Sequence, residues 1–325
     1  MNDMRPKVVV TDYAFADLNT ERHILEPAGC ELVGGQCKTE ADLINLCRDA
    51  DAVITQFARV NANVIGAMTR ARVIVRYGIG VDNVDLEAAR ARKIPVCNIP
   101  DYCMDEVADH TLAFILATTR QVVPHTVHLR AGQWGLAVPV AGMKTLRDLT
   151  VGVVGFGRIG REVVKRLVAF KGVVLVFDPV VPKAEIEKLG ARAASFDELL
   201  PAADVLTLHC PSTPQTRKLM NRDTLARLKR GAILINVGRG DLVDTPALTE
   251  ALESGQLAAA ALDVFDPEPI PAGHPILKRS NVILAPHIAS TSIAAVKKLR
   301  EGAANLALLA VQGKPLANVV NGVKP

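Results

Sequence analysis

The 325-residue sequence lacks several patterns that each point to a class of protein. Its six cysteines lie at irregular intervals and form no C-x-x-C pair. This spacing argues against a metal cluster or a redox pair and favours reduced, buried thiols in a cytoplasmic protein. No apolar run approaches the roughly twenty residues that a membrane-spanning helix needs. The first ten residues pass straight into a strand-like run, so we expect no secretory signal segment and no membrane partner.

Concentrated charge is also missing. Lysine and arginine are scattered along the chain and the formal net charge is only +4, so the sequence gives no sign of a nucleic-acid or membrane surface. We find no repeat at a solenoid period and no low-complexity segment. An apolar content of 49% with 22% charged residues is ordinary for a globular protein, and the length predicts about two domains.

The first hundred residues alternate between short apolar runs and helical patterns. Such alternation predicts a parallel, doubly wound α/β sheet with helices on both faces. We expect strands at 7–11, 30–33, 51–55, 72–76 and 95–97, and helices at 20–29, 41–49, 61–67 and 86–92. This part of the chain has no dinucleotide fingerprint of its own.

A dinucleotide fingerprint begins instead at residue 150. The β-branched run 150–154 meets Gly155, Gly157 and Gly160 and passes into a helical pattern. The first glycine permits a tight turn, the second lets the backbone approach a pyrophosphate, and the third allows close packing of helix on strand. Asp178 ends the next strand, where its carboxylate can bind both ribose hydroxyls and repel a 2′-phosphate. The sequence therefore predicts NAD in preference to NADP.

The remaining chain predicts a second α/β domain of the Rossmann type. A long apolar helix at 105–120 is followed by a stretch to residue 145 that is broken by glycine and proline, which we expect to be irregular and to pack on something else. The final helix, 292–312, comes too late for the second sheet and is expected to return to the first. We expect six strands, at 150–154, 173–177, 204–208, 232–237, 258–263 and 281–285. The predicted domains are 1–103 with 291–325 for substrate, and 104–290 for NAD.

Three strand ends of the second domain carry side chains suited to acid–base chemistry. Arg239 lies between two glycines and offers a planar fork for a carboxylate and an adjacent carbonyl. His287 can give or take a hydroxyl proton, and Glu268 can hold its ring in one tautomer. Together with a hydride-carrying cofactor, these groups can interconvert a 2-hydroxy acid and a 2-oxo acid. Taken singly, each has a plainer explanation, as a solvated arginine, a surface glutamate and a capping histidine.

The motifs GFGRIG, NVGRG, LDVFDPEP and APHIAS, in this order and spacing, resemble the D-isomer-specific 2-hydroxyacid dehydrogenase family over nearly the whole chain. That family includes phosphoglycerate dehydrogenases, glyoxylate and hydroxypyruvate reductases, and the C-terminal-binding protein corepressors. The resemblance implies a flavodoxin-like substrate domain made from both chain ends, a central NAD domain, an active-site cleft between them, and a homodimer formed largely by the NAD domains.

Carried onto this sequence, the resemblance assigns the site residues. The catalytic residues would be Arg239, Glu268 and His287, and the substrate would also contact Gln56, Ile79 and Gly80. Contacts with NAD are expected from the glycine turn, the adenosine side and the nicotinamide side, at Gly155, Gly157, Arg158, Ile159, Gly160, Asp178, His209, Cys210, Pro211, Thr216, Val237, Asp263, Ala289 and Ser290. We interpret the other histidines, His23, His110, His125, His128 and His274, as structural or solvated.

The sequence leaves the substrate open among phosphoglycerate, glyoxylate and hydroxypyruvate. Arg76, followed by the two glycines of RYGIG, resembles phosphoglycerate dehydrogenases. Those enzymes, however, usually show an arginine and a serine where this chain has 55–57, and a phosphate needs fixed cations. The segments QFARV and RYGIGVDN also resemble the corepressor branch, so an NAD(H)-responsive binding protein is the alternative. Formate oxidation is disfavoured, because that branch normally has glutamine at position 268, whereas phosphite oxidation uses the same three residues.

Overall fold

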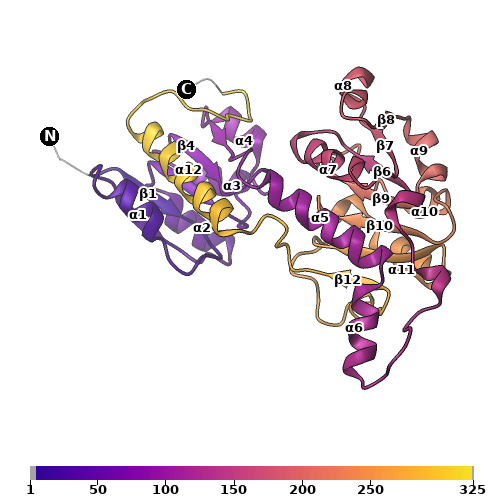
Figure 1. Cartoon of the computed structure of the whole chain (residues 1–325). Coiled ribbons are helices and arrows are strands. Elements are labelled where there is room, and N and C mark those ends of the chain that lie inside the picture. The colour runs from indigo at the N-terminus through magenta and orange to yellow at the C-terminus, as the bar shows by residue number, and fades with distance from the viewer. Residues whose placement is uncertain (1–4, 324–325) are drawn as a thin grey trace. The chain divides into compact units, whose positions relative to one another are not determined.

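The computed structural model describes residues 5–323. The chain divides into two compact units (Figure 1). Unit 1 combines the residues up to Tyr102 with those from Ser292 onward, and unit 2 runs from Cys103 to Thr291. Each unit is a parallel sheet flanked by helices, so the prediction of two doubly wound α/β domains is confirmed. Within the described residues, no helix is long and apolar enough to cross a membrane.

Unit 1 is a five-stranded parallel sheet in the order β2-β1-β3-β4-β5, the flavodoxin-like arrangement. Apart from the edge strand β2, its strands are almost wholly buried, as a parallel sheet between helices requires, and they therefore read as continuous apolar runs. The strands are β1 (Lys7–Val10), β2 (Glu31–Gly34), β3 (Ala52–Thr55), β4 (Val73–Arg76) and β5 (Val96–Cys97), and the helices are α1 (Asn19–Leu25), α2 (Glu40–Cys47), α3 (Ala62–Ala67), α4 (Leu86–Ala91) and α12 (Ile293–Val311).

The C-terminal helix α12 covers one face of this sheet. Its buried residues Leu299, Ala303 and Ala307 pack in one core with Val8 of β1 and Ile54 of β3. Each large apolar side chain buried in this way contributes roughly 1.5–3 kcal/mol. Leu25 of α1 lies in the same core, so α12 and α1 cover this face together, which explains why the chain returns to its first sheet.

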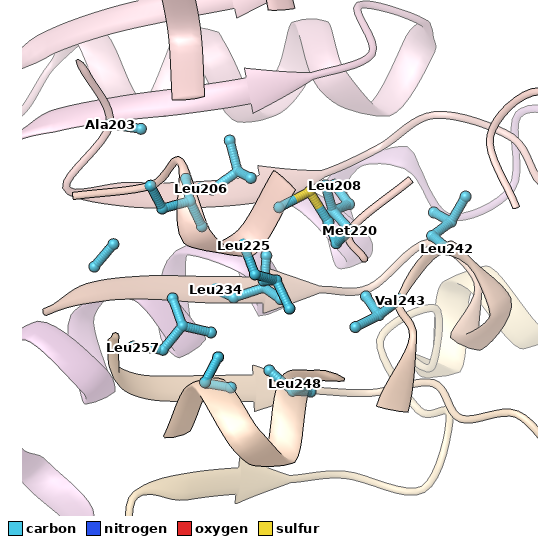
Figure 2. Close-up of a cluster of buried hydrophobic side chains, with 14 of the residues drawn as sticks. Ala203, Leu206, Leu208, Met220, Leu225, Leu234, Leu242, Val243, Leu248 and Leu257 are labelled. Atoms are coloured by element: carbon cyan, nitrogen blue, oxygen red, sulfur yellow. The ribbon is translucent and has the colours of Figure 1, made fainter. Parts of the chain in front are cut away.

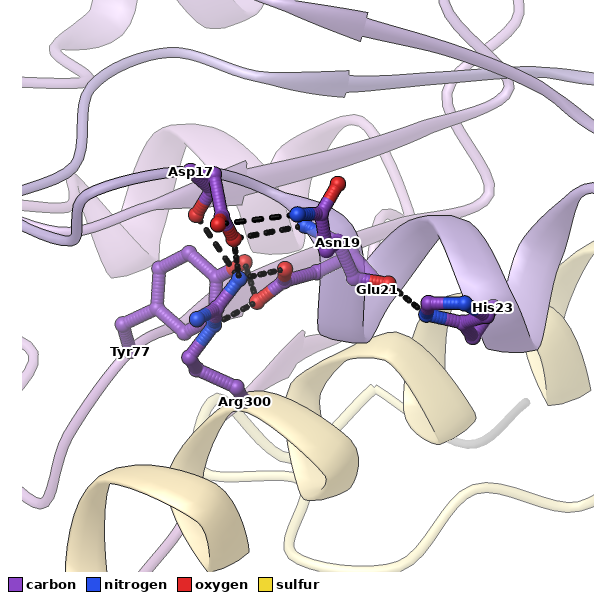
Figure 3. A network of polar contacts seen from close by, with 6 residues as sticks. All are labelled: Asp17, Asn19, Glu21, His23, Tyr77 and Arg300. Atoms are coloured by element: carbon purple, nitrogen blue, oxygen red, sulfur yellow. Dashed lines mark hydrogen bonds and ion pairs between the residues drawn. The ribbon is translucent and has the colours of Figure 1, made fainter. Parts of the chain in front are cut away.

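A buried polar network also joins α12 to α1 (Figure 3). Arg300 of α12 donates to both carboxylate oxygens of Glu21, at 2.9 and 2.6 Å, and the side chain of Glu21 is completely buried. The hydroxyl of Tyr77 donates to the same carboxylate at 2.8 Å. Arg300 also lies over the ring of Phe15, 4.9 Å from its centroid. The network therefore ties the two distant parts of unit 1 together.

Unit 2 is a seven-stranded parallel sheet in the order β12-β11-β10-β9-β6-β7-β8, whose two halves meet between β6 and β9. Its strands are β6 (Thr150–Val154), β7 (Val173–Phe177), β8 (Arg192–Ala193), β9 (Val205–Leu208), β10 (Ala232–Asn236), β11 (Leu257–Leu262) and β12 (Val282–Leu284). The α-helices are α5 (Met104–Thr119), α6 (Val122–Arg130), α7 (Arg158–Val168), α8 (Lys183–Glu187), α9 (Phe196–Ala202), α10 (Arg222–Ala226) and α11 (Thr245–Glu253), and the 3-10 helices are η1 (Val140–Gly142), η2 (Leu146–Asp148), η3 (Gly240–Leu242) and η4 (Pro275–Lys278).

A leucine-rich core holds this second sheet (Figure 2). Leu206 of β9, Leu234 of β10 and Leu257 of β11 are fully buried, and they form one cluster with Leu225 of α10 and Leu248 of α11. Because these strands are parallel, their carboxyl ends meet at one edge of the sheet. The strand ends that the sequence singled out therefore belong to one edge of one rigid core.

Two elements of unit 2 differ from the sequence-based expectation. The stretch after α5, expected to be irregular, contains the nine-residue helix α6. Pro124 lies in its first turn, where a missing N–H group leaves no helical hydrogen bond unmade. The sheet also has a seventh strand, β8, which is only two residues long and too short to leave a pattern in the sequence.

Candidate active site

The glycine turn after β6 fits closely against neighbouring backbone. Gly155 has a φ of +96°, and a Cβ there would lie 2.7 Å from the backbone N of Cys210. A Cβ on Gly160 would lie 2.2 Å from the carbonyl oxygen of Gly155. Neither position can hold another residue without moving the main chain, whereas nothing lies within 4 Å of a Cβ on Gly157. The turn therefore has the tight and open positions that a dinucleotide fingerprint requires.

The N-terminus of α7 follows this turn and has no side-chain cap. Gly157 is its N-cap residue, so no side chain accepts a hydrogen bond from the first-turn N–H groups. Such groups, at the positive end of an 11-residue helix, favour an anion. Gly157 and Arg158 are both exposed at this end. The residues present therefore fit a pyrophosphate, the group that NAD would place here.

Asp178 lies at the end of β7, beside the glycine turn. Its Oδ2 accepts a hydrogen bond from the N–H of Phe156 at 2.7 Å, and its Oδ1 accepts from Val180 and Val181. Burial alone would raise the pKa of Asp178, but these backbone donors hold it below the ordinary value. The group is therefore an ionised carboxylate. A cavity of about 200 Å³, lined in part by Asp178 and by Ile186, opens here, and the sequence did not indicate it.

The residues expected on the adenosine side form hydrogen bonds with β6, with β9 and within their own loop. The N–H of His209 donates to the carbonyl of Val154 at 2.7 Å, and its Nε2 lies 2.9 Å from the hydroxyl of Thr207. Burial lowers the pKa of His209 to about 3 and raises the pKa of Cys210 to about 11, so both side chains are neutral. The hydroxyl of Thr216 donates to the carbonyl of Pro211. Contact of this loop with a cofactor stays a prediction.

His287 and Glu268 form a hydrogen-bonded pair. The Nδ1 of His287 lies 2.8 Å from Oε2 of Glu268, and the other glutamate oxygen accepts the N–H of Phe265 at 2.8 Å. Burial would raise the pKa of Glu268, but the contact with His287, the Phe265 N–H and the charge of Arg239 lower it below the usual value. The glutamate is therefore ionised and fixes the orientation of the imidazole.

Asp263, at the end of β11, supports the turn that carries His287. The backbone carbonyl of Asp263 accepts the N–H of His287 at 2.7 Å. Its two carboxylate oxygens accept the N–H groups of Ile288 and Ala289, at 2.8 and 2.9 Å. The family resemblance implies a contact between Asp263 and the nicotinamide, which stays a prediction. The bonds present here show that it also orders the 287–289 backbone.

Arg239 is brought close to Glu268 by the glycine that follows it. A Cβ on Gly240 would lie 2.0 Å from the carbonyl group of Phe265, so only glycine lets the loop after β10 touch the loop after β11. The side chain of Asn236 fixes the arginine backbone by donating to its carbonyl at 2.7 Å. One guanidinium nitrogen of Arg239 donates to the Gly238 carbonyl at 2.8 Å. The structure thus brings the three predicted catalytic residues to one edge of the sheet in unit 2.

The predicted substrate residues of unit 1 lie on two connected loops. The side-chain oxygen of Gln56 accepts the N–H of Ala14 at 2.7 Å, and this glutamine is largely buried. Asn83, from the loop that also holds Ile79 and Gly80, donates to the carbonyl of Gln56 at 3.4 Å. These side-chain bonds show how the loops are held, and their contact with a substrate stays a prediction.

No sequence pattern points to the group that organises the loop around Gln56. Asp12, at the end of β1, is largely buried. It accepts hydrogen bonds from three successive backbone N–H groups, those of Gln56, Phe57 and Ala58, at 3.1, 2.7 and 3.1 Å. An aspartate after an apolar strand leaves no signal of this role, because its partners are more than forty positions away in the chain. Across residues 5–323, no group of three or more His, Cys, Asp or Glu side chains is arranged to hold a metal ion.

Comparisons with known proteins identify the family and agree with the fold. Residues 112–289 match the model of the D-isomer specific 2-hydroxyacid dehydrogenase, NAD binding domain. The D-3-phosphoglycerate dehydrogenase of Methanocaldococcus jannaschii is 38% identical over 97% of this chain, which spans 59% of that protein. The glyoxylate reductase of Thermofilum pendens is 36% identical over 98% of this chain and 95% of its own length. A solved structure, the D-lactate dehydrogenase of Aquifex aeolicus complexed with NAD and lactic acid, has a TM-score of 0.85 at 27% identity, with 94% of this chain and 96% of that chain covered.

Proposed function

The chain belongs to the D-isomer-specific 2-hydroxyacid dehydrogenase family, and we propose that it interconverts a D-2-hydroxy acid and its 2-oxo acid with NAD. One observation carries the proposal: the 2.8 Å hydrogen bond between His287 and Glu268 at the sheet edge where Arg239 also lies. An acid–base group, its orienting carboxylate and a substrate-binding cation are the three protein groups that this reaction needs.

Each of these side chains has a distinct task in the proposed reaction. The guanidinium of Arg239 binds the substrate carboxylate and the neighbouring oxygen. Glu268 accepts the Nδ1–H of His287, so the proton exchanged with the substrate oxygen travels on Nε2. The ionised glutamate also stabilises the imidazolium that exists between proton transfers. NAD, held at the glycine turn, would accept or supply the hydride.

The substrate we favour is small and unphosphorylated, such as glyoxylate or hydroxypyruvate. Three successive backbone N–H groups form a concavity that suits an anion, and in the loop 56–58 this concavity is already filled by the carboxylate of Asp12. These donors are therefore not available to a substrate phosphate, and residues 56–58 offer it no buried cation. The match to a glyoxylate reductase over 95% of its length supports the same choice.

The experiment that tests this function is a panel of NADH oxidation assays. Glyoxylate, hydroxypyruvate, pyruvate, longer 2-oxo acids and phosphohydroxypyruvate are compared, and the first two should give the highest kcat/KM. His287→Ala should lower kcat by about a hundredfold to ten-thousandfold, because a positioned acid–base group contributes that much. NADH affinity, measured by fluorescence, should be retained. Negligible turnover on every acid would instead favour the corepressor-like alternative. Equal turnover by parent and variant would contradict the acid–base role of His287.

We also propose that the chain forms a homodimer through the segment after α5. Large apolar side chains are exposed along α6 and beyond it, including Val127 at 61%, Leu129 at 57%, Trp134 at 93% and Val140 at 71%. Several large apolar side chains exposed in one segment are typical of an interaction site. The chain has no acidic residue between Asp109 and Asp148, so a second copy meets an apolar and mildly basic surface here.

Analytical ultracentrifugation tests this interface. The parent should sediment as a dimer, and Trp134→Ser combined with Val140→Ser should sediment as a monomer at the same concentration. The exposed Val180→Ser in the same unit is the matched control and should leave the mass unchanged. A monomeric parent, or a double variant that stays dimeric, would contradict the proposal.

The cysteines support a cytoplasmic location, which we propose as well. All six are free thiols. Burial raises the pKa of Cys47 and of Cys97 to about 12, so these thiols do not ionise at neutral pH and are poor nucleophiles. Buried, unpaired and inert thiols are typical of proteins in a reducing compartment.

A further inference from the structure

His110, which is not one of the three predicted catalytic residues, faces Asp263, the aspartate that supports the turn of His287. His110 lies on α5, and its Nε2 is 3.9 Å from Oδ1 of Asp263. This Nε2 is buried, and it has no hydrogen-bond partner among the described residues. The ring packs edge-on against Phe114, with 4.4 Å between the ring centroids, so the direction of the imidazole is set by its own helix.

The partner that His110 faces is a fully buried carboxylate. The side chain of Asp263 is 0% exposed, and each of its oxygens accepts one backbone N–H, from Ile288 and from Ala289. An ionised carboxylate has about four acceptor positions, and a buried charge is costly unless donors surround it. Two of these positions are used by the backbone. A third donor on the His110 side would therefore occupy one of the acceptor positions that remain.

What Asp263 holds in place is the backbone of His287. This residue has a φ of +54°, in the left-handed region that non-glycine residues adopt only when their surroundings hold them there. The carbonyl of Asp263 takes the His287 N–H, and its carboxylate takes the next two N–H groups. A displacement of Asp263 would therefore move His287 away from Glu268.

We propose that His110 is a positioning residue, which carries its proton on Nε2 and directs it at Asp263, the group that holds the turn of His287. At 3.9 Å the contact is longer than a hydrogen bond. Contacts in ligand-free active sites are often long and shorten when the substrates bind, and a small rotation of the His110 ring is enough here. The effect on turnover rests on the proposed function, whereas the position of the proton on His110 does not.

The position of the proton is tested first, on the ligand-free protein. Imidazole ¹⁵N shifts are recorded on the labelled chain, and His110 is assigned from the signal lost in His110→Gln. We expect a protonated Nε2 and an unprotonated Nδ1. Asp263→Asn should shift the His110 signals and leave those of His23 unchanged, because His23 lies in the other unit. A proton on Nδ1, or no response of His110 to Asp263→Asn, would overturn the proposal.

The effect on catalysis is tested with a pair of variants. His110→Leu removes the donor, and we expect kcat for 2-oxo acid reduction to fall about tenfold, the value of one hydrogen bond to a charged group. KM and NADH affinity should stay near the parent values, because His110 touches neither ligand in this proposal. His110→Gln, which retains an N–H donor, should restore most of the lost kcat. The matched exchange in unit 1, His23→Leu, should behave as the parent.

The outcomes separate this inference from the proposed function. A His110→Leu variant with full kcat, or equal losses in the leucine and glutamine variants, would show that the donor has no role. If the parent itself reduces no 2-oxo acid, the proposed function fails while the ¹⁵N measurement still decides the proton position. Should His110→Leu fail to fold, the glutamine variant and the ¹⁵N shifts carry the test.

Discussion

The two units use the same device for different ends. Each places an aspartate at the end of a strand and gives both carboxylate oxygens to backbone N–H groups of a loop. In unit 1, Asp12 fixes the loop after β3, which carries Gln56 and Phe57. In unit 2, Asp263 fixes a turn that carries a titratable histidine. The sheet and its aspartate are therefore a scaffold, and the chemistry comes from the side chain that the scaffold presents.

The units also differ in how their parts of the chain are joined. Unit 2 is one continuous stretch of chain with a leucine-rich core. Unit 1 is assembled from both ends of the chain, and Arg300 of α12 forms a buried ion pair with Glu21 of α1. Unit 2 has a comparable arginine, Arg166, but its partners Asp105 and Asp109 are 72% and 69% exposed. The discontinuous unit is therefore joined by a buried ion pair, whereas the ion pairs that Arg166 forms with Asp105 and Asp109 in the continuous unit lie at the surface.

The largest expected effect comes from breaking the buried pair. Arg300→Met should destabilise unit 1 by about 3–5 kcal/mol, because it leaves the Glu21 carboxylate buried without its partner. Arg166→Met, the matched exchange in unit 2, should cost within about 1 kcal/mol, as exposed ion pairs do. Amide hydrogen exchange measures the stability of each unit separately, in β1 and β3 for unit 1 and in β9 and β10 for unit 2. Equal losses in the two variants would remove the distinction between the units.

A double variant sharpens this prediction. Glu21→Met combined with Arg300→Met removes both charges, so most of the lost stability should return. A double variant as unstable as Arg300→Met alone would mean that the lost packing of the arginine over Phe15, and not the stranded charge, is the cause.

Much of this organisation could be predicted from the sequence, for a physical reason. Strands buried on both faces read as apolar runs, and the carboxyl ends of parallel strands share one edge. Gly155, Asp178 and His287 could therefore be placed on one edge of a sheet from the sequence alone. The return of the last helix to the first sheet could also be predicted, because the second sheet is already complete before that helix begins.

The features that escaped prediction depend on contacts with no local pattern. Helix α6 buries none of its side chains, so its valines show no helical periodicity of burial. From the sequence, His110 is interpreted only as structural or solvated, because Asp263, which it faces, lies on another element far along the chain. Asp12 was overlooked for the same reason. Periodicity reports what a single element buries, and it says little about a polar side chain whose partners come from elsewhere.

The next largest expected effect is a loss of NAD affinity, and it tests whether only unit 2 binds the cofactor. Asp178→Ala should weaken NAD binding by about tenfold or more, since hydrogen bonds to a charged group are worth roughly 1.5–3 kcal/mol, and it should relax discrimination against NADP. Asp12→Ala, the matched aspartate of unit 1, should leave NAD affinity unchanged while it disturbs the loop 56–58. Isothermal titration with NAD and NADP measures both. An unchanged preference in Asp178→Ala would exclude its ribose role.

The smallest expected effect is a difference in how the units respond to acid. The pKa of His209 is lowered by burial from 6.5 to about 3, so below pH 6.5 the unfolded chain gains a proton that the folded unit 2 does not. The free energy of unfolding of unit 2 should therefore decrease as the pH is lowered from 6.5 toward 3. This one group contributes at most about 1.4 kcal/mol per pH unit to that decrease. His209→Gln should remove that part of the slope, because glutamine does not titrate. Hydrogen exchange at pH 6.5 and pH 5.5 compares β9 and β10 with β1 and β3 in parent and variant. If the protection of unit 2 falls equally in both proteins, the burial of His209 is not what makes this unit the more acid-sensitive one.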